Sequence, residues 1–268
     1  MSDTDLSADR NFDDLAERFS RRIHNSLKGR IRVAVVQRDL RETIPGLGEN
    51  SATDKLRILD AGGGPGGFAV LLAEQGHDLV YCDISGKMLA LAREQARQAG
   101  VEESVRFYQE PVQTLLEKDR DFQVILFHAV LEWLAKPREV LDQIISVMPG
   151  GARLSLLFYN ERSIVFRNLL RGNFYRATSS DQRGHEGSLT PSHPLDPDDV
   201  KGWLQAHPVS ICCESGVRTF YDYGERNRLD QRTPEQIIEM EKRFSRQSPY
   251  RDLARYYHII IQKNRGPR

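Results

Sequence analysis

A cluster of glycines after a short apolar run is the feature that most constrains the fold of this chain. Residues 58–67 read ILDAGGGPGG, in which five of the ten residues are glycine. Glycine loses much conformational entropy when it is fixed inside a helix or strand, so such a cluster belongs in a turn. A turn between a strand and a helix lets a ligand approach the backbone closely and exposes the helix N-terminus. The cluster therefore predicts a ligand-binding turn in an α/β unit.

Strand-like and helix-like segments alternate along the chain from this point. We predict strands at residues 56–61, 78–82, 105–108, 122–127 and 152–158, and helices at residues 66–75, 85–99 and 137–148. This order is typical of βαβ units and a parallel sheet. Beyond residue 159 the alternation weakens. We predict helices at 163–170, 198–206 and 234–244, a largely extended segment at 209–221, a final strand at 253–262, and a loop at 172–197.

The residues before the first strand predict a helical segment. Apolar residues recur every three or four positions between residues 11 and 24, which predicts an amphipathic helix. A break at Lys28 and Gly29 separates it from a second predicted helix at 31–44. We therefore expect a disordered N-terminus at 1–10, a helical cap at 11–48, a main domain at 49–263 with a substrate-side insertion at about 160–200, and a tail at 264–268.

The charge balance limits the possible partners. Lys and Arg number 38, as do Asp and Glu, so the formal net charge is zero and a nucleic acid would have to be held by local clusters. Three segments are rich in basic residues, namely 18–38, 153–183 and 243–268. The charge run in each could also be a solvated face. Three such segments in a neutral protein favour contact with RNA phosphates.

The cysteines and the apolar runs indicate the compartment. Cys82, Cys212 and Cys213 form neither a metal-binding spacing nor a disulfide framework. Their scarcity suits a reducing compartment. The start of the chain is polar, and no apolar run approaches the length of a membrane span. We therefore expect a cytoplasmic protein with no bound metal and no membrane contact.

Two acidic residues refine the meaning of the glycine turn. Gly62, Gly64 and Gly67 fit the spacing of a dinucleotide-binding fingerprint, so an NAD(P) enzyme is one candidate. Asp60 lies two residues before the glycines, and Asp83 ends the second predicted strand, where a carboxylate can accept both ribose hydroxyls. Asp83 could instead cap the following helix, and Asp60 could instead stabilise the turn.

In combination, these segments resemble class I S-adenosylmethionine-dependent methyltransferases. The sequence LDAGGGPG at 59–66 is similar to their first motif, and VYCDIS at 80–85 is similar to their ribose-binding motif. Residues 121–133, the turn MPGGARLSL and the closing strand at 258–263 match the order of later elements. The resemblance implies a Rossmann-like, doubly wound, mostly parallel seven-stranded sheet with an antiparallel C-terminal strand. A dehydrogenase would need a second domain, for which little chain remains.

A narrower resemblance covers residues 10–263. The segments RNFDDLAERFSRRI, FHAVLEWLAKP, SGVRTFYDY and RQSPYRDLARYYHI, with FYN and GNF between them, resemble the family of tRNA 5-carboxymethoxyuridine carboxyl methyltransferases. These enzymes esterify a modified wobble uridine, so the resemblance implies tRNA carrying 5-carboxymethoxyuridine as partner and S-adenosylmethionine as cofactor. The loop at 179–187 contains one arginine where some relatives have a lysine-rich tract.

The same resemblance implies roles for individual residues. Arg32 would reach the carboxylate of the cofactor, Asp83 would hold its ribose, and His128 would face its methionine end. The remaining implied cofactor residues are Asp60, Gly62, Gly63, Gly64, Ile84 and Val112. Pro111 and Gln113 are alternatives to Val112 beside the adenine. Arg32 could instead form a surface salt bridge, and His128 could be a buried, satisfied histidine.

The implied chemistry needs no general base, because a carboxylate with a pKa near ~4 is already ionised at neutral pH. The enzyme must bring the carboxylate and the methyl donor into line. The substrate-orienting candidates are Tyr159, Asn160, Asn173, Arg218 and Arg255. Tyr159 could instead belong to the core, and Arg255 could form an ion pair at a strand edge.

Two other functions compete with the tRNA enzyme. A small-molecule methyltransferase of the same fold would use Phe19, Phe166, Phe174 and Tyr221 as the walls of an apolar pocket. A binding module could keep the fold without chemistry, although the intact Asp60, glycine turn and Asp83 argue against it.

Overall fold

A computed structural model describes residues 9, 11, 13, 26–48, 55–179, 181–182, 191 and 193–266. Most of the predicted helix at 11–24, of the segment 1–10 and of the loop at 179–187, and the end of the tail, lie outside the described residues. No described helix is both long enough and apolar enough to cross a membrane.

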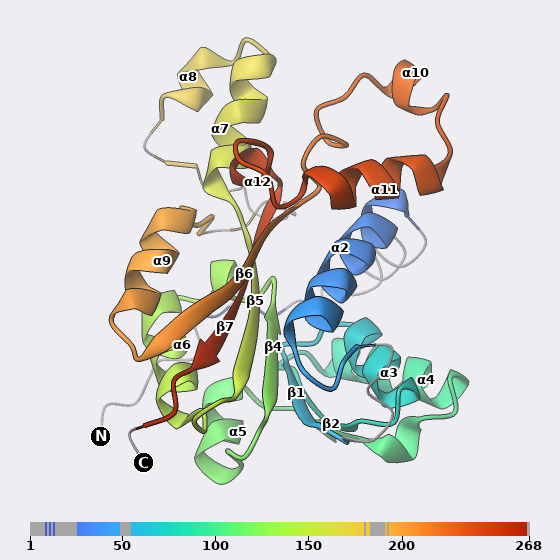
Figure 1. Cartoon of the computed structure of the whole chain (residues 1–268), viewed down its shortest axis with the longest axis vertical. Coiled ribbons are helices and arrows are strands. Elements are labelled where there is room, and N and C mark those ends of the chain that lie inside the picture. Colours follow the sequence, from blue (N-terminus) through green and yellow to red (C-terminus); the bar gives the residue numbers. More distant parts are fainter. Residues whose placement is uncertain are drawn as a thin grey trace.

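The described chain forms a seven-stranded sheet in the order β3-β2-β1-β4-β5-β7-β6 (Figure 1). The strands are β1 Arg57–Ala61, β2 Asp78–Cys82, β3 Val105–Tyr108, β4 Val124–His128, β5 Arg153–Tyr159, β6 Val209–Val217 and β7 Tyr256–Lys263. Among these strands, β7 alone runs opposite to the others, so it pairs antiparallel with both β5 and β6. The predicted fold class is therefore confirmed.

Helices cover both faces of the sheet (Figure 1). One face packs against α2 Leu27–Thr43, α3 Gly67–Glu74, α4 Gly86–Gln98 and α11 Pro234–Phe244. The other packs against α5 Val112–Lys118, α6 Pro137–Val147 and α9 Pro197–Gln205. The interior strands are buried on both faces, which explains why β1, β2 and β4 read as nearly continuous apolar runs.

The remaining helices lie at one end of the molecule. They are α7 Glu161–Leu170, α8 Phe174–Ala177, α10 Arg226–Leu229 and α12 Tyr250–Leu253. Figure 1 shows α7 and α8 on one side of the upper end and α10 and α11 on the other. Two single turns, η2 Glu102–Ser104 and η3 Leu131–Trp133, complete the described elements.

The predicted break at Lys28 and Gly29 is wrong, because α2 begins at Leu27 and runs through both residues. Ser26 caps this helix, and its side chain accepts a hydrogen bond from the Gly29 N–H at 3.2 Å. Gly29 is buried in the first turn, so it belongs to the packed side of α2 instead of a linker.

Three further expectations need correction. The extended segment predicted at 209–221 ends at Val217, because Arg218 has a φ of 65°. A side-chain-bearing residue in this left-handed region interrupts the strand. The predicted loop at 172–197 contains the short helix α8. The final strand starts at Tyr256, since α12 occupies residues 250–253.

Candidate active site

A cavity of about 1070 Å³ lies where the glycine turn, α2 and the ends of β2, β4, β5 and β7 meet. Ligands of open α/β sheets bind at the carboxyl ends of the strands, which is where the parallel strands place this cavity. All nine predicted cofactor residues line it together: Arg32, Asp60, Gly62, Gly63, Gly64, Asp83, Ile84, Val112 and His128. The fold thus brings together side chains that are far apart in sequence.

The glycine turn fits closely against its surroundings. Gly62 and Gly64 have φ values of 64° and 54°, which side-chain-bearing residues rarely adopt. A Cβ on Gly63 would lie 2.6 Å from Cε2 of Tyr81 and 2.7 Å from Oδ2 of Asp60. A Cβ on Gly62 would lie 2.5 Å from Cγ2 of Val130. These positions accept only glycine, and the turn therefore presents bare backbone to the cavity.

Asp83 braces this turn. Its carboxylate accepts hydrogen bonds from the Gly64 N–H at 3.0 Å and from the Ser85 N–H at 2.8 Å. The cap of α4 is Ser85, which accepts from the Met88 N–H. Asp83 thus supports the helix cap but does not itself form it. Burial raises the pKa of Asp83, although both amide hydrogen bonds favour its ionised form.

Asp60 is buried beneath the glycine turn, and its Oδ2 atom has no hydrogen-bond partner among the described residues. Burial and the neighbouring charge of Asp83 raise the pKa of Asp60 to about 7. A backbone N–H from Ala69 favours its ionised form, in keeping with a turn-stabilising contribution. An unpartnered buried carboxylate oxygen at a ligand-binding turn is a candidate acceptor for a ligand.

His128 and Glu132 lie on the inner wall of the cavity. Burial, together with the charge of Arg32, holds the pKa of His128 well below its ordinary value, so its imidazole is neutral. Its Nδ1 atom has no partner within the described chain. Glu132 accepts a hydrogen bond from the Tyr159 N–H at 3.1 Å through Oε1, whereas its Oε2 atom has no described partner. Burial raises the pKa of Glu132 to about 7.

Arg32 of α2 also lines the cavity, and its charge acts on both His128 and Glu132. Its guanidinium stacks on the ring of Tyr256 with its carbon 4.2 Å from the ring centroid. No ion pair joins Arg32 to a described residue, so the alternative of a surface salt bridge finds no support within the described chain. Stacking leaves the edge of the guanidinium available to a carboxylate in the cavity.

A cluster of basic side chains around one carboxylate occupies the substrate side of the cavity. Asp222 accepts from Nε of Arg218 at 2.9 Å and from Nε of Arg255 at 3.0 Å, and Nζ of Lys28 lies 3.3 Å away. Arg218 and Arg255 hold the pKa of Asp222 below its usual range despite burial. Arg255 also donates to the hydroxyl of Tyr159. Tyr159, Arg218 and Arg255 therefore occur together, as predicted substrate-side residues should.

Arg167 of α7 lines the same cavity, and sequence reasoning missed it. Its Nε atom is buried without a described partner. Burial and the charge of Arg255 lower the pKa of Arg167. Only its place in the basic segment 153–183 could have pointed to it. Arg32, Arg167 and Arg255 come from the three separate basic segments, and all three line this cavity.

Asn160 and Asn173 are placed differently from the other candidates. Asn160 is fully buried and caps α7 by accepting from the Arg162 N–H at 3.1 Å. Its amide donates to the carbonyls of Asp252 and Ala254, each at 2.9 Å. Asn173 caps α8. Neither is among the described residues that line the cavity, so a substrate-orienting role for them stays a prediction.

The apolar walls expected for a small-molecule enzyme do not assemble among the described residues. Phe166 packs edge-on against Tyr223 at 5.0 Å between ring centroids, and Arg226 covers the ring of Tyr221. Phe174 is 63% exposed. Phe19 lies outside the described residues. The described chain likewise contains no group of three or more His, Cys, Asp or Glu side chains that could hold a metal ion.

Comparison with known proteins identifies close relatives. A family model described as a methyltransferase domain matches residues 58–151. The tRNA 5-carboxymethoxyuridine methyltransferases of Escherichia coli O157:H7 and Escherichia coli strain K12 are each 40% identical over 258 residues, which cover 95% of this chain and 97% of theirs. Magnesium protoporphyrin IX methyltransferase from Synechocystis PCC 6803, solved with bound S-adenosylmethionine, matches with a TM-score of 0.58 at 15% identity, over 94% of this chain and 93% of that one. This last likeness shows the fold.

Proposed function

This chain belongs to the tRNA 5-carboxymethoxyuridine methyltransferase family, and on that premise we propose that it esterifies the carboxylate of 5-carboxymethoxyuridine at the wobble position of tRNA. The prediction of an S-adenosylmethionine-dependent methyltransferase is confirmed by the family and by the methyltransferase domain at residues 58–151. The proposed product is the methyl ester, 5-methoxycarbonylmethoxyuridine.

The observation that carries the proposal is the excess of cations on the substrate side. Three cations, Lys28, Arg218 and Arg255, contact the carboxylate of Asp222. A fourth, Arg167, lines the same cavity, so cations outnumber carboxylates within this cluster. A carboxylate ligand would supply negative charge and hydrogen-bond acceptors to this cluster. The buried, unpartnered Nε of Arg167 marks one place at which it could bind.

Strained backbone accompanies this cluster. Among the described residues, only Ala129 and Arg218 combine a side chain with a positive φ, 59° and 65° respectively. Both line the cavity. Such conformations concentrate at functional sites because the surrounding structure holds them in place. Here they set the direction of Arg218 and of the chain beside His128, which supports a substrate-binding role for this end of the cavity.

The residues present fit the cofactor. The glycine turn offers bare backbone that a Cβ would block, and Asp60 and His128 each hold a buried polar atom without a described partner. We propose that Asp83 binds the ribose, that Arg32 binds the cofactor carboxylate, and that Ile84 and Val112 flank the adenine. S-adenosylmethionine, when bound, supplies an electrophilic methyl group on a sulfonium.

The protein's contribution to the reaction is orientation. A carboxylate oxygen of the substrate forms a bond to the methyl carbon while the carbon–sulfur bond breaks, and both electrons of that bond remain on sulfur. The products are the ester and S-adenosylhomocysteine, and no proton moves. Arg167, Arg218 and Arg255 would hold one carboxylate oxygen and leave the other directed at the methyl group, which converts binding into alignment.

The segment around α8 suits contact with the tRNA outside the cavity. Leu170, Phe174 and Tyr175 are exposed by 58%, 63% and 89%, and the exposed Arg171 lies among them. Unpaired bases stack on aromatic rings, and arginines bind phosphates. Because α8 follows α7, which carries Arg167, this surface adjoins the proposed carboxylate site. We propose that Phe174 and Tyr175 contact bases of the anticodon loop.

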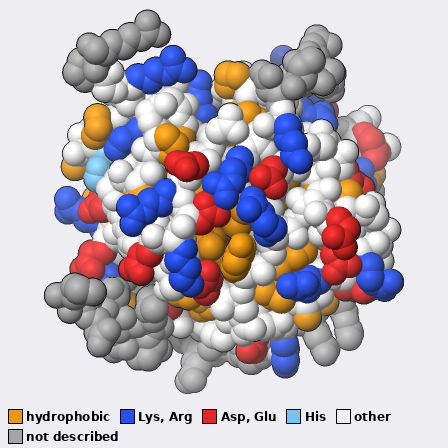
Figure 2. Space-filling model, turned by 90° about the horizontal axis from the view of Figure 1, so that it is seen from below, with side chains coloured by type: hydrophobic (Ala, Val, Ile, Leu, Met, Phe, Trp, Pro, Cys, Tyr) orange, Lys and Arg blue, Asp and Glu red, His pale blue; other side chains and the backbone are white. Residues whose placement is uncertain are grey.

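The opposite end of the molecule has a different character. Figure 2 shows the face seen from below Figure 1, where basic and acidic side chains are interspersed. An interspersed face is a poor match for a polyanion, because acidic side chains between the basic ones repel phosphate. Among the side chains coloured in this view, this face offers tRNA no continuous basic surface.

We also propose a division of the chain that follows this function. Residues 11–48 would cap the cofactor side of a domain at 49–263, and the insertion at about 160–200 would face the tRNA. The proposed substrate also places the activity in the cytoplasm.

The direct test is mass spectrometry of wobble nucleosides. The purified protein, S-adenosylmethionine and tRNA carrying 5-carboxymethoxyuridine should yield the methyl ester. Removing one charged hydrogen-bonding partner with Arg167→Gln should lower kcat/KM about ten- to hundredfold. The comparison variant, Arg171→Gln, should leave kcat nearly unchanged but weaken tRNA binding and reduce the slope of log affinity against log salt by about one phosphate contact. Equal methylation of the free nucleoside, without salt-dependent tRNA binding, would instead identify a small-molecule enzyme.

A further inference from the structure

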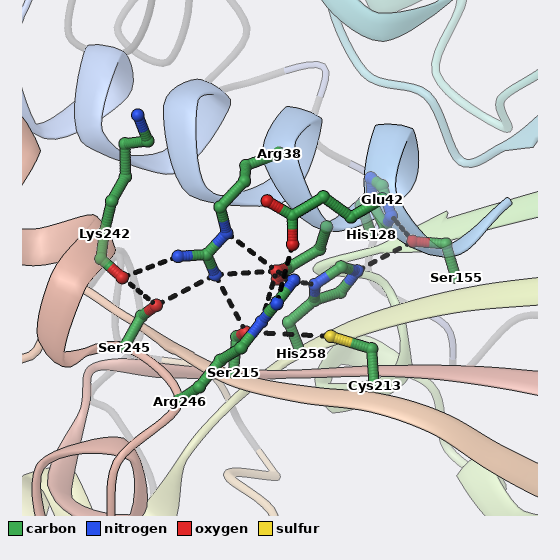
Figure 3. A network of polar contacts seen from close by, with 11 residues as sticks. Arg38, Glu42, His128, Ser155, Cys213, Ser215, Lys242, Ser245, Arg246 and His258 are labelled. Atoms are coloured by element: carbon green, nitrogen blue, oxygen red, sulfur yellow. Dashed lines mark hydrogen bonds and ion pairs between the residues drawn. The ribbon is translucent and has the colours of Figure 1, made fainter. Parts of the chain in front are cut away.

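A line of buried polar side chains crosses the sheet from α2 to the cofactor cavity (Figure 3). Oδ2 of Asp39 lies 2.9 Å from Nδ1 of His258, and Nε2 of His258 lies 2.8 Å from Oγ of Ser155. The same Oγ lies 2.8 Å from Nε2 of His128. Asp39, Ser155 and His258 are fully buried. Nothing in the proposed chemistry uses this line directly.

Asp39, at the end of the line away from the cavity, determines which group donates and which accepts in each hydrogen bond of the line. Oδ1 of Asp39 accepts from Nη2 of Arg38 and from Nη2 of Arg246, each at 2.6 Å. Two guanidiniums therefore keep Asp39 ionised, and His258 must donate its Nδ1–H to Oδ2. Arg38 and Arg246 already balance the carboxylates of Asp39 and Glu42, so a positive charge on this fully buried imidazole would be uncompensated, and we take His258 as neutral. Its Nε2 atom is then an acceptor.

The remaining polarity follows step by step. Because Nε2 of His258 accepts, the hydroxyl of Ser155 must donate to it. The oxygen of Ser155 is then free to accept, so Nε2 of His128 carries the proton. A neutral imidazole has one N–H, and Nδ1 of His128 is therefore left with a lone pair. This is the atom without a described partner on the wall of the cavity.

We propose that Asp39, His258 and Ser155 are positioning residues that fix the tautomer of His128, so that its Nδ1 accepts a hydrogen bond from the ammonium group of the cofactor's amino-acid end. Arg32, on the same cavity, suits the carboxylate of that end. The ammonium group of this zwitterion would thus bind the acceptor Nδ1 of His128, and its carboxylate would bind the cation Arg32. With the reversed polarity, Nδ1 would carry a proton and repel the ammonium.

The test exploits a substitution that should reverse the line. In Asp39→Asn, the amide oxygen would remain with Arg38 and Arg246, and the amide nitrogen would donate to Nδ1 of His258. His258 would then donate to Ser155, Ser155 to His128, and Nδ1 of His128 would become protonated. Nitrogen-15 NMR of the histidine side chains should find His128 protonated at Nε2 in the native protein and at Nδ1 in the variant.

Binding measurements separate this role from a merely structural one. S-adenosylhomocysteine carries the amino-acid end, whereas 5′-methylthioadenosine lacks it. Asp39→Asn should weaken S-adenosylhomocysteine about ten- to hundredfold and leave 5′-methylthioadenosine unchanged. Glu42→Gln is the matched control, because Glu42 pairs with Arg246 at 2.7 Å but stands outside the line, and it should change neither affinity.

A second variant covers the case in which Asp39→Asn folds poorly. Ser155→Ala removes only the linking hydroxyl, so it should release the tautomer of His128 and weaken S-adenosylhomocysteine selectively. Two results would overturn the proposal. One is native His128 protonated at Nδ1. The other is an equal loss of both ligands in a variant that remains folded. Neither measurement involves tRNA, so the outcome is independent of the proposed substrate.

Discussion

The buried carboxyl of Asp60 makes the stability of the ligand-free protein depend on pH. Its pKa is raised from 3.8 to about 7, so the folded state binds a proton more tightly than the unfolded state does. Stability from this group is therefore greatest below the unfolded pKa and is lost as pH rises toward about 7. The substitution Asp60→Asn removes the titrating group while keeping the side-chain shape.

The expected magnitude follows from the shift. Each pKa unit corresponds to about 1.4 kcal/mol. Between about pH 5 and about pH 8, about two pH units lie below the pKa of Asp60 in the folded state, so the free energy of unfolding of the native protein should fall by about 3 kcal/mol. Asp60→Asn should abolish this loss. The substitution also removes the repulsion between Asp60 and Asp83, which is one cause of the raised pKa of Asp60.

Urea unfolding of both proteins at the two pH values provides the assay. Any cost of the unpartnered Asn amide is independent of pH, so it cancels when each protein is compared with itself. Glu132, whose pKa burial also raises to about 7, titrates in both proteins. The native protein should therefore lose more stability than the variant by about 3 kcal/mol. Equal losses would refute the reasoning that Asp60 is buried without compensation.

Three further substitutions test the site. Gly63→Ala should lower both stability and cofactor affinity, because its Cβ would lie 2.6 Å from Tyr81, and calorimetry measures both quantities. The control is Gly202→Ala in α9, where the added Cβ would have no atom within 4 Å, so the protein should be stabilised by up to about 1 kcal/mol. Asp222→Asn should destabilise by about 3–5 kcal/mol in denaturant titrations at neutral pH, since it leaves buried cations unpaired. That difference should shrink as pH falls below about 4, because the depressed pKa of Asp222 confines its contribution to higher pH, and a pH-independent difference would contradict the ion-pair explanation. Tyr175→Ala should weaken tRNA binding by about 1–3 kcal/mol in a filter-binding assay without changing cofactor affinity, and unchanged tRNA binding would remove Tyr175 from the interface.

The sequence predicted the sheet well because its signals are local. The buried strand β2 is a continuous apolar run, and the partly exposed edge strand β3 is a short run after a turn; the predicted bounds of both match the structure. The glycine turn and Asp83 could likewise be found from a short motif. The helix break predicted at Gly29 was wrong because a glycine in the first turn of a capped helix cannot be distinguished, from local sequence, from a glycine between two helices.

The missed residues depend on long-range packing. Arg167 faces the cavity only because α7 is oriented by the cap at Asn160, which joins it to carbonyls more than ninety residues away. Asp222 gathers Lys28 and Arg255 from opposite ends of the chain. No spacing rule in the sequence encodes such meetings. The sequence shows that these residues are charged, but it does not show that they lie together in the folded protein.

The position of β7 in the sheet determines when the site can be assembled during synthesis. This strand follows β6 in the chain but lies between β5 and β6, and His258 pairs with Leu157 on one side and with Ser215 on the other. Until β7 has left the ribosome, β6 lacks the strand with which it pairs, and Arg218 at its end lacks its contact with Arg255 across Asp222. Asp39 must also wait for His258, 219 residues later. A nascent chain can therefore form its glycine turn early, but it can acquire substrate only after its last strand is inserted.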